Sequence, residues 1–153
     1  MLVRDRMTAA PISVMPETSF IDAFHIIRER GIRHLPVVNK KNKLIGVVTQ
    51  KDLLQASPSS ATTLTVFEMN YLLANLQIEE VMTSPPITVL EETPIEEAAR
   101  VMVENDIGCL PVVRGAELVG MITEDDIFRA FVEILGRGEA ELRITLRVGD
   151  EPG

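Results

Sequence analysis

Two stretches of the sequence place a hydroxyl and a carboxylate at the same spacing behind an apolar run. They read GVVTQKDLL, which contains Thr49 and Asp52, and GMITEDDIF, which contains Thr123 and Asp126. An ionised carboxylate offers two oxygens and only accepts hydrogen bonds, so it can hold both hydroxyl groups of a ribose. Free N–H groups at a helix start favour a phosphate nearby. The same residue types at this spacing are therefore compatible with a sugar-phosphate ligand.

The same four residues also have a purely structural interpretation. A Thr-x-x-Asp sequence before a helix is close to a capping box, in which the hydroxyl and the carboxylate accept hydrogen bonds from backbone N–H groups at the helix start. A cap of this kind stabilises a helix by about 0.5–2 kcal/mol. Binding and capping use the same geometry, so the sequence leaves both interpretations open.

The two stretches belong to a longer internal repeat. At an offset of 75 residues MTAAPISV matches MTSPPITV and the two LPVV segments coincide, and at an offset of 74 the glycine, threonine and aspartate of the two stretches align. One copy is too short to bury a sufficient core by itself. We therefore expect two copies that pack sheet against sheet with approximate twofold symmetry.

Each copy predicts the order strand, helix, strand, strand, helix, which gives an α/β (α+β) fold. Apolar residues at three- and four-residue spacing indicate a helix with one buried face, and β-branched runs joined by a polar turn indicate two paired strands. In the first copy we expect strands at 12–15, 32–38 and 44–49 and a first helix that ends at Arg30; in the second copy we expect a first strand at 87–90 and a first helix that ends at Asn105.

The repeat also predicts how the chain is divided. VFEMNYLLANL has the apolar spacing of a helix and follows the loop-forming stretch SPSSATTLT. Helix and loop together would connect the two copies. The expected parts are repeat 1 at 1–57, a linker with a connecting helix at 58–77, repeat 2 at 78–136 and a tail at 137–153.

Composition narrows the classes of function. The net charge of −8 argues against nucleic-acid binding, because a phosphate backbone requires a basic surface. The N-terminus has no apolar run typical of a signal peptide or a membrane span. The single cysteine, Cys109, allows no internal disulfide and fits a reducing compartment. These features predict a cytoplasmic protein that binds neither nucleic acid nor a membrane.

The charge is divided unevenly between the copies. Residues 1–57 hold nine Lys and Arg against five Asp and Glu, a net charge of +4, whereas residues 58–153 hold six against 18, a net charge of −12. Arg33 and His34 precede LPVV in the first copy, where the second copy has glycine and cysteine. The first copy therefore offers the more favourable surroundings for an anion.

The motifs resemble a tandem pair of CBS domains, the cystathionine-β-synthase-type regulatory module. MTAAPISV and MTSPPITV, GIRHLPVV and IGCLPVV, and LIGVVTQKDLL and LVGMITEDDIF carry the resemblance, which covers nearly everything from Val3 to about Leu135. Such modules bind adenosine compounds such as AMP, ADP, ATP or S-adenosylmethionine and regulate what is attached to them. The resemblance implies a regulatory, adenosine-nucleotide-binding function, with a ligand-free dimerisation module as the alternative.

The resemblance also implies the residues of two ligand sites. The carboxylate would hold the ribose, the threonine would lie beside the sugar-phosphate, and the segment after each Met-Thr pair would line an apolar slot for the adenine. The residues implied for the ribose and sugar-phosphate are Thr49, Asp52, Thr123 and Asp126, and those implied for the adenine are Pro11, Ile12, Pro86 and Ile87. The two isoleucines have the alternative of being ordinary core residues of a strand.

The two sites are expected to differ in their affinity for phosphate. Lys51 precedes the first aspartate, whereas two further carboxylates precede the second. In some nucleotide-sensing members of the family, basic residues at the positions of Arg33 and His34 contact phosphate, and only the first copy has them. Because like charges repel a triphosphate, we predict that the Asp52 site is the better phosphate site, although Arg33 could reach across to the other one.

An enzymatic function has little support in the sequence. His34 and Cys109 occupy matching repeat positions, but a nucleophilic cysteine also needs a third group that orients its base, and no motif supplies one. No ligand cluster has the spacing of a metal site, and no glycine loop is typical of phosphate binding. We therefore predict no enzyme and no required cofactor, with the adenosine nucleotide as a regulatory ligand.

The C-terminal part predicts two further features. Phe128, Phe131, Val132 and Leu135 form an apolar helix face without enough partners inside one chain, so we expect a homodimer with twofold symmetry, as the resemblance also implies. ELRITLRVGDEPG alternates like a half-buried strand and resembles the first strand of an ACT domain. The order CBS, CBS, ACT resembles the acetoin utilisation protein B-like family, and we expect a truncated form or a natural remnant of such a protein.

Overall fold

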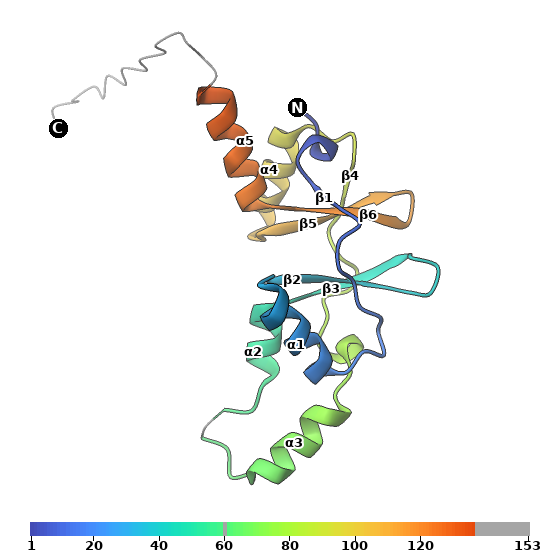
Figure 1. Cartoon of the computed structure of the whole chain (residues 1–153), viewed down its shortest axis with the longest axis vertical. Coiled ribbons are helices and arrows are strands. Elements are labelled where there is room, and N and C mark those ends of the chain that lie inside the picture. The colour runs from blue at the N-terminus through green and yellow to red at the C-terminus, as the bar shows by residue number, and fades with distance from the viewer. Residues whose placement is uncertain (60, 137–153) are drawn as a thin grey trace, which may run out of the picture.

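Two β-hairpins lie at the centre of the molecule, with helices on the outer side of each (Figure 1). The computed structural model describes residues 1–59 and 61–136. Helix, strand, strand, helix occurs twice in chain order, which confirms the predicted α+β fold. The elements are η1 (Val3–Asp5), β1 (Thr8–Ala9), α1 (Phe20–Arg30), β2 (His34–Val38), β3 (Leu44–Thr49), α2 (Gln50–Ala56), α3 (Val66–Asn75), η2 (Ile78–Glu80), β4 (Val89–Leu90), α4 (Ile95–Asn105), β5 (Cys109–Arg114), β6 (Glu117–Thr123) and α5 (Glu124–Gly136).

The two hairpins have the same pairing and the same irregularity. β2 pairs antiparallel with β3, and the register shifts between Val37 and Val38. β5 pairs antiparallel with β6, and the register shifts between Val112 and Val113, at the matching repeat positions. Helices cover the outer side of each hairpin and the other hairpin lies on the inner side. Strands covered on both faces read as nearly continuous apolar runs, as these do.

The sheets face each other across a small buried cluster. Val47 of β3, Cys109 of β5 and Met121 of β6 form this cluster. At the hairpin turns, the Leu44 N–H donates a hydrogen bond of 3.0 Å to the carbonyl oxygen of Ala116. The packing of sheet against sheet, predicted from the repeat, is therefore confirmed.

The first strand of each repeat is shorter than the sequence predicts. Of the strand expected at 12–15, only Val14 pairs, through a single parallel bridge to Val37. The strand expected at 87–90 is reduced to β4. Prolines lie on both sides of Val14, and Pro86 precedes β4. Proline has no N–H to donate to a strand ladder, which limits how far these segments can pair.

The N-terminal segment of each repeat crosses to the other half of the molecule. Val3 is fully buried in the core of the second half, and Ile78 is fully buried in the core of the first. β1 accordingly pairs with β6, and Thr83 forms a bridge to Val47 of β3. The predicted domain boundaries follow the repeat in the sequence, whereas each core includes a segment from the other copy.

The linker helix and the first helix of each repeat end close to their predicted positions. α3 begins at Val66 as predicted, and Leu73 packs against the core of the first half. Gly31 and Asp106 follow α1 and α4 in the left-handed conformation, with φ angles of 61° and 52°. The tail at 137–153, including the expected ACT-like strand, lies outside the described residues. In the part of the chain that the structure describes, no helix combines the length and the apolar character that crossing a membrane requires.

Candidate functional site

Both Thr-x-x-Asp sequences form helix caps. The Thr49 N–H donates to Oδ2 of Asp52 at 2.8 Å, and the Asp52 N–H donates to Oγ1 of Thr49 at 3.1 Å. In the second copy the Thr123 N–H donates to Oδ2 of Asp126 at 2.9 Å, with a return bond of 3.4 Å. The capping interpretation is therefore confirmed. It leaves room for binding, because Oδ1 of Asp52 accepts no hydrogen bond within the described residues.

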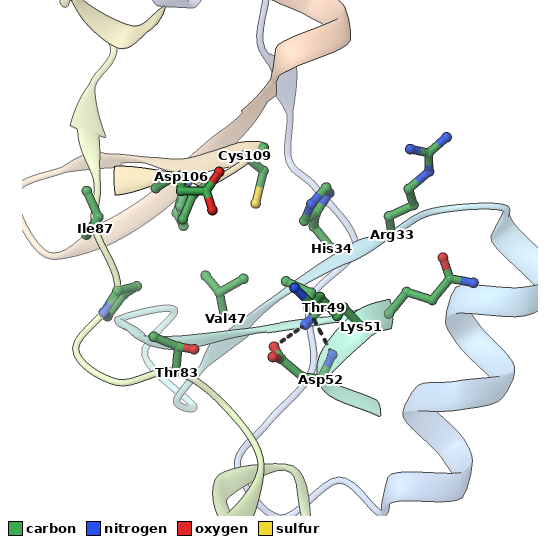
Figure 2. A pocket seen from close by; sticks show the side chains of 15 residues that line it. Arg33, His34, Val47, Thr49, Lys51, Asp52, Thr83, Ile87, Asp106 and Cys109 are labelled. Carbon is green, nitrogen blue, oxygen red and sulfur yellow. Dashed lines mark hydrogen bonds between the residues drawn. The ribbon is translucent and has the colours of Figure 1, made fainter. Parts of the chain in front are cut away.

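A cavity of about 410 Å³ opens beside this first cap, and we call it the Asp52 cavity (Figure 2). Residues from both halves of the chain surround it, so it lies between the two repeats. Seven of the predicted site residues line it. The lining residues are Arg33, His34, Val47, Thr49, Gln50, Lys51, Asp52, Thr83, Pro86, Ile87, Asp106, Ile107, Gly108, Cys109 and Pro111.

A second cavity of about 340 Å³ lies at the related position beside Thr123, and we call it the Thr123 cavity. Asp126, implied by the resemblance for this site, is not among its lining residues, while Glu124 and Asp125 are. The full lining comprises Thr8, Pro11, Ile12, Gly31, Ile32, Arg33, His34, Gly108, Met121, Thr123, Glu124 and Asp125.

The crossing of the N-terminal segments decides which proline–isoleucine pair lines which cavity. Pro86 and Ile87, from the second repeat, line the Asp52 cavity, while Pro11 and Ile12 line the Thr123 cavity. Ile12 and Ile87 are each 41% exposed. A core residue would be buried, so the interpretation of these isoleucines as ordinary core residues is wrong. Each presents an apolar surface to its cavity.

The start of α2 has fewer free N–H groups than the sequence suggests. The Gln50 N–H donates a 2.8 Å hydrogen bond to the carbonyl oxygen of Arg33, and the Asp52 N–H is bound by the cap. The Glu124 N–H of α5 is bound in the same way by the carbonyl oxygen of Gly108 at 3.0 Å. A phosphate at either cavity would therefore depend mainly on side chains, and the first of these bonds holds Arg33 next to α2.

Arg33 and His34 line both cavities. In Figure 2 His34 lies between the two layers of strands, and the Arg33 side chain extends away from Asp52. Burial lowers the pKa of His34 below its usual 6.5, and the charge of Arg33 adds to this effect, while Glu124 and Asp52 oppose it. The neutral form of the His34 imidazole is therefore favoured at pH 7.

The two cavities differ in the ratio of cationic to anionic side chains that line them. The lining of the Asp52 cavity includes two cations, Arg33 and Lys51, and two carboxylates, whereas the lining of the Thr123 cavity includes Arg33 and two carboxylates. Lys51 is exposed, as expected for a cation at the mouth of a site. The lining of the Asp52 cavity is therefore the less negative of the two, as the charge distribution in the sequence indicates.

Cys109 also lines the Asp52 cavity but has the wrong chemistry for a nucleophile. Its side chain is buried, and burial raises the pKa of the thiol to about 12, with further contributions from Asp52 and Glu124. The reactive form of a cysteine is the thiolate, which is scarce at neutral pH for such a group. The placement of Cys109 with Val47 and Met121 instead agrees with a packing role.

Several lining residues were not predicted as site residues, and they include a hydroxyl and a carboxylate. Thr83 and Asp106 border the Asp52 cavity, and neither was predicted to be a ligand-site residue. Thr8, the counterpart of Thr83, lines the Thr123 cavity. The repeated Met-Thr pair was a usable signal, because a hydroxyl that recurs at the same repeat position points to a shared site. No pattern in the sequence pointed to Asp106.

Comparison with known proteins gives a consistent result. The family model described as the CBS domain matches residues 3–59 and 78–133. A putative acetoin utilization protein (AcuB) from Vibrio cholerae is 34% identical, with a TM-score of 0.73 over 89% of this chain and 93% of that one. CBSX2 of Arabidopsis thaliana, solved in complex with AMP, is 31% identical, with a TM-score of 0.73 over 88% of this chain and 98% of that one.

Another similar structure carries a different adenosine compound. The CBS domain pair of protein MJ0100, in complex with 5′-methylthioadenosine and S-adenosyl-L-methionine, is 30% identical, with a TM-score of 0.73 over 88% of this chain and 98% of that one. An L-aspartate semialdehyde sulfurtransferase of Methanocaldococcus jannaschii is 32% identical over 85% of this chain. The match spans 23% of that enzyme, so this chain corresponds to about a quarter of the curated relative.

Proposed function

Because this chain belongs to the CBS-domain family, with one domain in each half, we propose that it is a regulatory module that binds an adenosine compound in the Asp52 cavity. One observation carries the proposal: a carboxylate, two cationic side chains and an apolar segment, far apart in the sequence, meet around one cavity. The AMP complex of CBSX2 and the S-adenosyl-L-methionine complex of MJ0100 support the choice of ligand class.

Each part of such a ligand has a chemical counterpart in the Asp52 cavity. We assign the ribose hydroxyls to Asp52, whose Oδ1 accepts no hydrogen bond within the described residues. The adenine ring would lie against Ile87 and Pro86, which supply an apolar surface. Lys51 and Arg33 would compensate the charge of a phosphate. The cavity volume, about 410 Å³, is in the range of small-molecule sites, roughly 300–1,000 Å³.

The Thr123 cavity is proposed to be the poorer phosphate site. Glu124 and Asp125 border it, and Arg33 is the only Lys or Arg among its lining residues. A like charge at 4 Å costs on the order of 1 kcal/mol in water and more where water is excluded. This cavity would therefore remain empty or take a ligand with little negative charge.

The cellular context is part of the same proposal. We propose a cytoplasmic module that is not itself an enzyme and that controls a protein to which it is attached or bound. The buried, protonated thiol of Cys109 fits a reducing compartment. Likeness to enzymes such as the sulfurtransferase is confined to a small part of their length, which is the pattern of a regulatory part shared among different enzymes.

Self-association is the second proposed property. Phe128, Val132 and Leu135 are 70%, 55% and 78% exposed on α5, and Phe67 is 82% exposed on α3. Large apolar surfaces of this kind mark interaction sites on soluble proteins. We propose a homodimer with twofold symmetry, and a protein that dimerises without binding any nucleotide is the alternative function.

A ligand panel distinguishes a nucleotide sensor from a ligand-free dimerisation module. At a ligand concentration of 100 times Kd, binding to the folded state alone stabilises the protein by about 2.7 kcal/mol. For a chain of this size we expect the Tm to rise by roughly 5–10 °C. Differential scanning fluorimetry with AMP, ADP, ATP and S-adenosylmethionine, with inosine monophosphate as a base control, measures this rise. A flat response across the panel would favour the dimerisation module.

The pH dependence of phosphate binding tests the role of His34. In the free protein the pKa of His34 is lowered, so the imidazole is neutral at pH 7 to 8. A bound phosphate favours the protonated form, so the complex takes up a proton that the free protein lacks. AMP binding should therefore tighten as the pH falls from 8 to 6, by up to about tenfold for each unit by which the ligand raises this pKa. Isothermal calorimetry at several pH values measures the change.

Two controls isolate the imidazole from other titrating groups. His34→Asn keeps a polar side chain of similar size but cannot take up the proton, so the extra tightening should disappear in this variant. Adenosine has no phosphate, and its affinity should stay constant with pH. The same pH slope for AMP in the parent chain and in His34→Asn would assign the slope to the phosphate itself.

A further inference from the structure

The internal repeat produces two equivalent grooves between helices. The α1–α2 groove, of about 440 Å³, includes Phe24, Arg28 and Arg33 in its lining. The α4–α5 groove, of about 540 Å³, contains the repeat counterpart of every residue that lines the first groove. Arg28 thus corresponds to Val103, and Arg33 corresponds to Gly108. The two grooves are the same structural feature with different side chains.

The charges of these two grooves are opposite. Arg28 and Arg33 line the α1–α2 groove, and its described lining includes no carboxylate. Asp106 and Glu124 line the α4–α5 groove, and its described lining includes no Lys or Arg. The substitution of Gly31 by Asp106 and of Gln50 by Glu124 at matching repeat positions produces this reversal.

Both grooves adjoin the two ligand cavities. Arg33 lines the α1–α2 groove and also both ligand cavities, and Gly108 lines the α4–α5 groove and the same two cavities. Figure 1 accordingly shows β2 and β5, which follow these helix ends, beginning on one side of the molecule. One surface of a second copy could therefore cover both grooves at once.

The α4–α5 groove also has apolar residues that no element of its own chain covers. Phe128 and Val103 on its border are 70% and 81% exposed. In the α1–α2 half, Leu54 occupies the repeat position of Phe128 and is 58% exposed. An apolar surface with charges at its rim is typical of a protein interface.

A twofold axis can join two copies in two ways. Head-to-head pairing would bring each groove against its own copy, so that two pairs of carboxylates meet and two pairs of arginines meet. Head-to-tail pairing would bring Arg28 and Arg33 of one copy against Asp106 and Glu124 of the other. Like charges at an interface are strongly unfavourable, and complementary charges select partner and orientation.

We propose that the α4–α5 groove of one copy packs against the α1–α2 groove of a second copy, and reciprocally, in a head-to-tail dimer. This inference rests on the self-association proposed above and adds its orientation. The occupant is fixed by the charge complementarity of the two grooves within a single sequence. Because both grooves adjoin the ligand cavities, the same contact would place the partner close to the bound ligand.

Cross-linking of single-cysteine variants tests the orientation. Leu54→Cys and Phe128→Cys place thiols at exposed, repeat-related positions. In a head-to-tail dimer a short bismaleimide should join Leu54→Cys chains to Phe128→Cys chains in a mixture, and neither variant alone should cross-link efficiently. Mass spectrometry of a mixture with one isotope-labelled partner identifies the joined chains. The unmodified chain, which has only the buried Cys109, is the control for background reaction.

A charge reversal provides a second, independent measurement. Arg28→Glu places a carboxylate in the α1–α2 groove without altering a residue that lines either ligand cavity. Head-to-tail pairing predicts that the dimer dissociation constant rises about five- to thirtyfold, since the change occurs at both contacts of the dimer. Head-to-head pairing predicts a tighter dimer. Lys40→Glu, an equal change in charge outside the grooves, is the matched control for sedimentation equilibrium.

The outcomes separate this inference from the two proposals before it. Cross-links within each single variant, or tighter association of Arg28→Glu, would overturn the head-to-tail orientation and leave self-association intact. A monomer at high micromolar concentration would overturn both. AMP calorimetry on the same samples reports nucleotide binding separately, so its absence would count against the ligand proposal and not against the orientation.

Discussion

Replacing Asp52 by alanine is expected to weaken AMP and ATP binding by roughly 10- to 150-fold, while Asp126→Ala leaves binding nearly unchanged. The loss corresponds to about 1.5–3 kcal/mol, the contribution of hydrogen bonds to a charged group. Asp52 lines the larger cavity together with Lys51 and Arg33. Asp126 caps α5 but is not among the residues that line the Thr123 cavity. Isothermal calorimetry on the two variants gives the comparison.

Both variants also have a structural cost. Each removes the carboxylate of a cap in which Oδ2 accepts from a threonine N–H at 2.8 or 2.9 Å, and Asp126→Ala loses in addition a hydrogen bond of 2.8 Å from the Thr123 hydroxyl. The loss of stability should therefore be at least as large for Asp126→Ala as for Asp52→Ala, and urea unfolding checks this. If the two variants differ in nucleotide affinity by more than their measured stabilities explain, the difference arises from a lost contact with the ligand. Equal losses of affinity, or a larger loss for Asp126→Ala, would show that the ligand uses the other carboxylate or neither.

The elements of this fold were predictable because their signals are local. Residues 44–49 form a strand with the predicted bounds, and α1 and α4 end at Arg30 and Asn105, since β-branched runs and helix ends depend on neighbouring residues. Gly31 after α1 adopts the left-handed conformation for which glycine is suited. The internal repeat then predicted the packing of sheet against sheet.

The crossing of the N-terminal segments was not predictable from the same signals. Val3 and Ile78 lie in short segments where apolar residues adjoin charged ones, and either half of the molecule could have buried them. The hydrogen bond of 2.8 Å from the Val3 N–H to the carbonyl oxygen of Thr93 joins residues far apart in the chain. Only the assembled structure pairs Pro86 and Ile87 with the Asp52 cavity, so the site residues were foreseen individually but not in their combination.

The exchange of segments explains a glycine whose role the sequence did not reveal. Gly46 of β3 and Gly120 of β6 are repeat counterparts, and both lie where a crossing Met-Thr segment passes over the sheet. A methyl group on Gly46 would lie 2.8 Å from the carbonyl oxygen of Thr83. Thr83 is held there by two backbone hydrogen bonds with Val47, of 2.9 and 3.1 Å. Glycine is required because the two backbones approach too closely for a side chain.

Gly46→Ala is therefore expected to destabilise the protein by about 1–3 kcal/mol, the usual cost of forcing extra volume into a packed region. The cost should be smaller for Gly120→Ala, because a methyl group there would lie 3.1 Å from the Thr8 carbonyl oxygen and would otherwise meet the flexible side chain of Met7. Gly136→Ala, with no atom within 4 Å of the added carbon, is the matched control and should change stability by less than about 0.5 kcal/mol.

Urea unfolding of the three glycine variants tests this order, and nucleotide binding adds a second readout. Thr83 and Val47 line the Asp52 cavity, so the shift that Gly46→Ala forces on them should also weaken AMP binding, whereas Gly136→Ala should not. An unfolding midpoint for Gly46→Ala equal to that of Gly136→Ala would mean that the crossing segment does not press on β3. In that case the exchange between the two halves would contribute little to the stability of the fold or to the shape of the cavity.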